Sequence, residues 1–118
     1  SDVCSSDLGT PLQKQQGIED NPDLAFDDWM KWGGPAADAV WARYYIEHTL
    51  HDLYHWAERN GAKWIDLKGQ EGNSVFRWTR ADDSGHGLMT KLIASCRAKG
   101  AKIITGAAVA VGDKVKWM

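Results

Sequence analysis

The sequence predicts a mixed α/β fold, and three observations support this class. Apolar residues recur at helical spacing through residues 36–60, and residues 62–67 and 75–80 are rich in β-forming residues. A helical pattern at 86–99 then leads into an apolar run at 101–108, a step that resembles half of a βαβ unit. The expected order is helix, helix, strand, strand, helix, strand, strand.

The two N-terminal helices are predicted from their start and stop signals. Asn21-Pro22-Asp23 is a helix start, so we expect a short helix over 23–32 that Gly33-Gly34-Pro35 ends. A longer helix is expected over 36–60, with Gly61 as its stop. Its apolar stripe faces the core and consists of Ile46, Leu50, Leu53 and Ala57.

The remaining elements are bounded by glycine, proline and acidic residues. Residues 9–17 are expected to form a loop, and residues 82–85 are expected to cap the helix over 86–99. Gly112-Asp113 predicts a tight turn before a strand at 115–117. The inward face of the last helix is predicted to carry Leu88, Leu92, Ile93 and Cys96.

Composition is that of a soluble globular protein and excludes several classes. Of the 118 residues, 43% are hydrophobic and 25% are charged, and the formal net charge is -2. This balance gives no reason to expect nucleic acid as a partner, because phosphate binding needs clustered Lys and Arg. No apolar run approaches the roughly 20 residues of a membrane span. Cys4 and Cys96 form neither a disulfide framework nor a zinc spacing, which favours a reducing, cytoplasmic setting.

The first eight residues resemble the translation of a common sequencing adapter. That adapter, read in frame, gives Ser1-Asp2-Val3-Cys4-Ser5-Ser6-Asp7-Leu8 in order. We therefore exclude residues 1–8 from the fold prediction and assign no role to Cys4. On this interpretation the natural chain is expected to begin further upstream.

Three histidines, His48, His51 and His55, fall on one face of the predicted long helix. Their spacing places them within about 60° of one another, because each α-helical residue advances by about 100°. Three imidazoles on one face suit zinc or another transition metal. The alternative, which we favour, is a polar helix face opposite the apolar stripe, since three ligands on one helix splay apart.

Two arginines, Arg77 and Arg80, lie on or just after a predicted strand, next to the start of the following helix. An arginine there can hold a carboxylate through a bidentate pair, either from a substrate or from the neighbouring and N-terminal Asp residues. Gly85-His86-Gly87 follows a strand and opens a helix, as a dinucleotide fingerprint does. Because Thr90 replaces the third glycine, a capped helix start is the favoured interpretation.

As an ordered whole, residues 9–118 resemble the flavoprotein family that includes soluble fumarate reductases, 3-ketosteroid dehydrogenases and related FAD-binding dehydrogenases. Three stretches carry the resemblance. They are Gly9 to Gln13 running into Gly17 to Asp23, then Trp56 to Trp64, and finally Gly72 to Arg77 followed by residues 85–92 and 99–109.

The resemblance implies FAD as the cofactor. Gly9 and Thr10 would then lie against the isoalloxazine, where small residues permit close approach. Gln13 would reach the flavin rim, and the Val109 backbone would meet the adenine edge. Arg80 is implied either to help line the substrate region or to tie the cap to the core. Family substrates are activated alkenes or their saturated forms, and hydride moves between them and flavin N5.

The implied organisation is an interior piece of a longer enzyme. Residues 9–37 would belong to a Rossmann-like FAD-binding domain, residues 38–80 would begin an α+β substrate cap, and residues 81–118 would return to the FAD-binding domain. The expected partners are a small-molecule substrate and the remainder of the parent chain. Catalytic residues are expected outside this chain, and no metal ligand is assigned.

Two other classes stay open on the sequence. One is a small non-enzymatic binding module with Trp41, Trp56 and Trp64 as surface anchors. The other is a metal-binding protein built on the three histidines.

Overall fold

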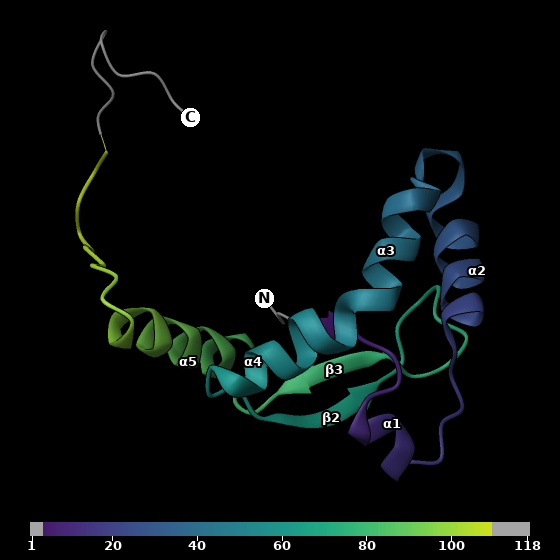
Figure 1. Ribbon diagram of the computed structural model, residues 1–118, viewed down its shortest axis with the longest axis horizontal. Helices are drawn as coiled ribbons and strands as arrows, with labels where there is room; N and C mark the ends of the chain where they lie inside the picture. Colours follow the sequence, from purple (N-terminus) through teal and green to yellow (C-terminus); the bar gives the residue numbers. More distant parts are fainter. Residues whose placement is uncertain (1–3, 110–118) are drawn as a thin grey trace, which may run out of the picture.

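The computed structural model describes residues 4–109, which form a mixed fold of helices around a small sheet (Figure 1). The sheet is antiparallel, with its strands in the order β1-β3-β2. Strand β2 spans Trp64–Lys68 and β3 spans Trp78–Ala81. Both strands therefore begin and end later in the chain than the predicted runs 62–67 and 75–80. Strand β1, at Cys4–Ser6, pairs with the other side of β3. The predicted mixed class is confirmed.

Two helices form a hairpin beside the sheet (Figure 1). Helix α2 spans Pro22–Gly33 and α3 spans Ala39–Thr49, and the short 3-10 turn η1 at Gly34–Ala36 joins them. Asn21 caps α2, because its Oδ1 accepts a hydrogen bond from the Leu24 backbone N–H at 2.9 Å. The predicted short helix is thereby confirmed, with its start signal acting as a side-chain cap.

The predicted long helix is present but changes its winding. Helix α3 passes into a π-helical segment, η2 at Leu50–His55, and then into α4 at Trp56–Arg59. A π-helix turns less per residue than an α-helix, so the side chains beyond α3 face other directions than α-helical spacing predicts. Tyr54 is therefore buried, whereas Leu53 is 36% exposed. The predicted apolar stripe is correct at Ile46 and wrong at Leu53.

Tyr54 belongs to the main core, which lies between this helix, the sheet and α5. Trp64 stacks on Tyr54 with ring centroids 5.5 Å apart, and its Nε1 donates to the Tyr54 carbonyl at 3.0 Å. Trp64 is thus a core residue, and its assignment as a surface anchor is wrong. Trp41 and Trp56 are exposed. The other buried members of this core are Ala57, Ala62, Ala81 and Leu88.

Helix α5, at Ser84–Ala98, starts without the side-chain cap that the sequence predicts. Asp83 and Ser84 have φ angles of 56° and 52°, in the left-handed region, and Asp83 makes no capping hydrogen bond. This sharp turn brings the Asp82 carbonyl against Gly87, where a Cβ would lie 1.8 Å from the carbonyl oxygen. The helix start therefore depends on close backbone packing at a glycine.

The chain after α5 leaves the body of the molecule (Figure 1). Residues 101–109 are exposed and form no strand, so the strand predicted over 101–108 is wrong. A strand needs a neighbour for its backbone N–H and C=O groups, and within residues 4–109 no strand pairs with this segment. Cys96, predicted to face inward, is exposed near the end of α5. The predicted turn at 112–113 and strand at 115–117 lie outside the described residues.

The N-terminal segment takes part in the fold. After β1, Leu8 is buried and packs in a second small core against α2 and α3. The buried Asp7 accepts a hydrogen bond from the Thr49 hydroxyl. Excluding this segment from the fold is therefore wrong from residue 4 onwards, whereas its adapter origin stays a prediction. Among the helices of the described chain, none has the length and apolar character to cross a membrane.

Candidate functional site

The residues expected at the flavin begin at a tight turn before α1, a short helix at Pro11–Gln15. Gly9 has a φ of +69°, a left-handed conformation that favours glycine. Thr10 caps α1, because its Oγ1 accepts from the Gln13 backbone N–H at 3.1 Å, and a proline occupies the first helical position. This five-residue helix replaces part of the loop predicted over 9–17.

Gln13 holds the turn from inside the protein, where its side chain is 1% exposed. Its Oε1 accepts from the Gly9 backbone N–H at 2.7 Å. Its Nε2 donates to Asp20 Oδ2 and to the Phe76 carbonyl, both at 3.0 Å. The amide oxygen thus holds the Gly9 backbone, while the amide nitrogen fixes the Gln13 side chain to Asp20 and Phe76. The implied contact of Gln13 with the flavin rim stays a prediction.

Arg77 is the centre of a buried polar network and is 3% exposed. Its Nε and Nη2 donate to the two carboxylate oxygens of Asp20 at 2.7 and 2.8 Å. Its Nη1 donates to Asp28 Oδ2 at 2.6 Å and to Asn73 Oδ1 at 3.3 Å. The Asp20 contact is bidentate, the geometry that a guanidinium makes best with a carboxylate. Of the partners considered from sequence, the acidic N-terminal third is the one that Arg77 contacts.

The network holds opposite charges away from water. Burial alone would raise the pKa of Asp28, but hydrogen bonds from the Ser74 backbone and hydroxyl and from Arg77 hold it below its ordinary value of 3.8. Burial would lower the pKa of Arg77, yet its hydrogen bonds to Asp20 and Asp28 raise it above its ordinary value. Asp28 and Arg77 are therefore both ionised at neutral pH.

Arg80 lies in the central strand β3 and is about one-third exposed. Its Nη2 donates to Asp66 Oδ2 on the neighbouring strand β2 at 3.2 Å. Its Nε is buried and has no hydrogen-bond partner among residues 4–109. Nη2 of the Arg80 guanidinium is thus bound to Asp66, whereas Nε makes no hydrogen bond within the described residues. The implied place of Arg80 in the substrate region stays a prediction.

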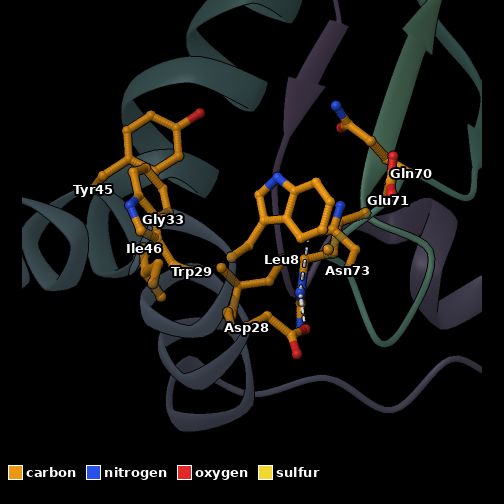
Figure 2. A pocket seen from close by; sticks show the side chains of 13 residues that line it. Leu8, Asp28, Trp29, Gly33, Tyr45, Ile46, Gln70, Glu71 and Asn73 are labelled. Carbon is orange, nitrogen blue, oxygen red and sulfur yellow. Dashed lines mark hydrogen bonds and ion pairs between the residues drawn. The ribbon is translucent and has the colours of Figure 1, made fainter. Parts of the chain in front are cut away.

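A cavity of about 360 Å³ opens beside the Arg77–Asp28 pair (Figure 2). It lies between α2, α3 and the loop that joins β2 to β3. Figure 2 shows Trp29 and Tyr45 on the helix side and Glu71 on the loop side. The rings of Trp29 and Tyr45 are 5.2 Å apart. The cavity is therefore lined by the aromatic rings of Trp29 and Tyr45 and by the charged side chains of Asp28 and Arg77.

Val109 is not brought near the Gly9 turn. It is 78% exposed and lies in the segment that leaves the molecule after α5, away from α1 (Figure 1). Its implied contact with an adenine edge stays a prediction. Gly9, Thr10 and Gln13 are the members of the expected flavin set that the fold does bring together.

The three histidines do not form a common site. His48 Nδ1 donates to the Tyr44 carbonyl at 2.7 Å, and its ring stacks on the Tyr44 ring. His51 and His55 instead pair with the acidic residues one and three positions ahead of them, at 2.6 and 2.8 Å. Within residues 4–109 no group of three or more His, Cys, Asp or Glu could hold a metal ion. The described residues therefore give no support to the metal-protein alternative.

Sequence reasoning missed the link between Arg77 and Gln13. Gln13 lies in α1 and Arg77 lies in the loop before β3, and both contact Asp20 Oδ2. One signal in the sequence was available. An arginine within a β-forming run is buried when that strand is buried, and a buried guanidinium needs carboxylates nearby. The acidic N-terminal third supplies them, but which of its acidic residues would reach Arg77 is decided by the fold.

The chain is similar to FAD-binding proteins. Residues 1–113 match the family described as FAD binding domain. The chain is 30% identical over 92 residues to the acrylate reductase flavoprotein subunit of Shewanella woodyi, an alignment that covers 77% of this chain and 18% of that protein. It also superposes on the open conformation of a flavocytochrome c3 fumarate reductase with a TM-score of 0.80 and 28% identity. That match covers 86% of this chain and 18% of the fumarate reductase.

Proposed function

The chain belongs to the FAD binding domain family and its cofactor is FAD, and from this premise we propose that it is part of a flavoenzyme acting on activated alkenes. The proposed reaction transfers a hydride between the flavin and a fumarate-like or ketosteroid-like alkene, or its saturated form. The chain spans 18% of the length of each of the two relatives named above. This activity is therefore proposed for a larger protein that contains the chain. The expected setting is cytoplasmic.

The observation that carries the proposal is the backbone at Gly9. A Cβ built there would be in ordinary van der Waals contact with one atom, Leu50 Cδ2, at 3.8 Å, and Gly9 itself is partly exposed. A flat isoalloxazine ring fits against bare backbone of this kind, where a larger side chain would hold it away. Thr10 and Gln13 are buried behind the turn and fix its shape.

These residues supply binding and orientation. FAD, when bound, supplies the hydride chemistry at flavin N5. Gly9 would contact the flavin, with Thr10 and Gln13 behind it. The backbone of Val109 would meet the adenine edge, and Arg80 would help to bind the substrate carboxylate or carbonyl. No proton donor is proposed among residues 4–109.

We further propose the division into functional segments that the family resemblance implies. Residues 9–37 and 81–118 would belong to the FAD-binding domain, and residues 38–80 would begin a cap that closes over the substrate. The partners would be a small-molecule substrate and the remainder of the parent chain. The aromatic cavity between α2 and the β2–β3 loop then lies between the first FAD-binding segment and the cap segment.

The proposal is tested on the protein encoded by the complete reading frame. The purified flavoprotein would be given a reduced dye as electron donor and, in separate assays, fumarate, acrylate or a 3-ketosteroid that carries a conjugated alkene. We expect one of the three to oxidise the reduced flavin with saturation kinetics. Succinate, which has no alkene, is the matched control for fumarate in this direction. A flavoprotein whose reduced form is reoxidised by none of the three alkenes contradicts the proposed substrate class.

A further inference from the structure

We propose that Arg77 is a positioning residue for the flavin-side turn, acting on Gly9 through Asp20 and Gln13. The inference rests on the proposed function, because it assigns Gly9 to the flavin. It adds a residue that touches neither cofactor nor substrate and still sets where the cofactor contact lies.

Three consecutive hydrogen bonds connect Arg77 with Gly9. Arg77 Nε donates to Asp20 Oδ2 at 2.7 Å, and the same oxygen accepts from Gln13 Nε2 at 3.0 Å. Gln13 Oε1 then accepts from the Gly9 backbone N–H at 2.7 Å. Because one oxygen of Asp20 serves both donors, a displacement of the guanidinium changes the position available to the Gln13 amide.

Every side chain in this path is withdrawn from water. Gln13 is 1% exposed, and the side chains of Asp20 and Arg77 are 1% and 4% exposed. Water therefore cannot replace a lost partner easily, and buried hydrogen bonds of this kind are costly to leave unmade. The position of the Gly9 turn therefore depends on the position of the Asp20 carboxylate.

The Arg77 end of the path lies in the proposed cap segment. Arg77 Nη1 contacts Asp28 of α2 and Asn73 of the β2–β3 loop, and Arg77 is one of the residues that line the aromatic cavity. Gln13 also donates to the Phe76 carbonyl in the same loop. The loop and the flavin-side turn are thus connected twice, so the position of the loop is transmitted to Gly9.

A purely structural role for Arg77 predicts a different outcome from a positioning role. A structural ion pair affects stability alone, and the flavin of the folded molecules is unchanged. A positioning residue also changes the surroundings of the flavin in molecules that remain folded. The two roles are therefore separated by measurements on the flavin rather than by activity.

The experiment uses the protein of the complete reading frame with the conservative variant Arg77→Lys. Lysine keeps the charge but loses the bidentate fork that sets the Asp20 geometry. We expect the folded variant to show a shifted visible flavin absorption band and an FAD dissociation constant raised by about tenfold. Arg43→Lys is the matched control, because Arg43 makes an exposed ion pair with Asp23. That control should leave both flavin readouts unchanged.

A second variant tests the path itself and replaces the first if Arg77→Lys does not fold. Gln13→Met removes all three hydrogen bonds of the amide, and it should shift the flavin band in the same direction. The double variant should shift the band no further than the larger single effect, because both residues act through Asp20. Unchanged flavin readouts in a folded Arg77→Lys or Gln13→Met protein overturn the inference. A wild-type protein that lacks flavin would instead overturn the proposed function.

Discussion

Arg77 grips Asp20 through two parallel hydrogen bonds, Nε to Oδ2 at 2.7 Å and Nη2 to Oδ1 at 2.8 Å, although the two residues are 57 positions apart in the chain. The pair joins the segment after α1 to the loop before β3. With Asp28 as a second carboxylate, it forms the buried charged centre from which both the Gly9 turn and the aromatic cavity are organised.

Removing the guanidinium should destabilise the protein severely. Arg77→Met leaves Asp20 and Asp28 buried without their cation, and breaking a buried ion pair in this way costs about 3–5 kcal/mol of unfolding free energy. Urea denaturation of the protein from the complete reading frame measures it. Arg43→Met, which breaks the exposed pair with Asp23, should cost no more than about 1 kcal/mol. Equal losses in the two variants would mean that the buried network is not a stabilising centre.

Stability should fall in acid because of Asp28. Its pKa in the folded state lies below the ordinary value of 3.8, so the unfolded state binds more protons as the pH falls towards that value. The carboxylate therefore contributes stability above the ordinary pKa and loses it as the pH falls through the lowered one. Unfolding free energies between pH 7 and about pH 3 should decline less steeply in Asp28→Asn. Parallel declines in the two proteins would rule out this origin.

A methyl group should not be tolerated at Gly87. The Cβ of an alanine would lie 1.8 Å from the Asp82 carbonyl oxygen, and the left-handed residues Asp83 and Ser84 at the start of α5 leave that backbone little freedom to move. Overpacking of this kind costs about 3 kcal/mol or more when the obstacle is backbone. The melting temperature of Gly87→Ala measures the effect, with Thr90→Ala on the exposed side of the same helix as control. A Gly87→Ala melting temperature close to that of the control would show that the helix start rearranges at little cost.

Metal should play no part in the histidine-bearing helix. His48, His51 and His55 each pair with a separate neighbour, so a single substitution removes one local contact and no shared ligand set. We expect His51→Ala to have the same zinc and nickel content as the wild type, measured by elemental analysis after dialysis. Stoichiometric metal in the wild type that disappears in the variant would restore the metal-protein alternative.

Local signals predicted the helices α2, α3 and α5 and the strands β2 and β3. Asn21 caps α2 as its position before Pro22 suggests, and the β-forming run before Lys68 becomes β2. These features depend on residues a few positions apart, and their physics is contained in a short window. The mixed class and the family resemblance follow from the order of such windows.

The features that sequence reasoning missed are set by tertiary structure. The π-helical winding of η2 brings Tyr54 rather than Leu53 into the core, and helical spacing alone assumes regular winding. The left-handed Asp83 replaces the expected side-chain cap because backbone packing at Gly87 governs the turn. At the site, Arg77 was identified as a carboxylate binder, but its choice of Asp20 required the fold.

The expected flavin residues divide in the same way. Gly9 and Gln13 are close in sequence, and a local turn holds them together. Val109 is about a hundred residues away, and its contact would depend on a strand neighbour that residues 4–109 do not provide. Its role can be predicted by resemblance but not from the local pattern.

The most direct test of the account is the flavin content of the protein encoded by the complete reading frame. The protein would be purified without added cofactor and denatured, and the released flavin would be identified and measured by absorbance against the protein concentration. We expect FAD, at one molecule per chain. A folded protein that releases no flavin, and takes up none when FAD is added, would contradict it.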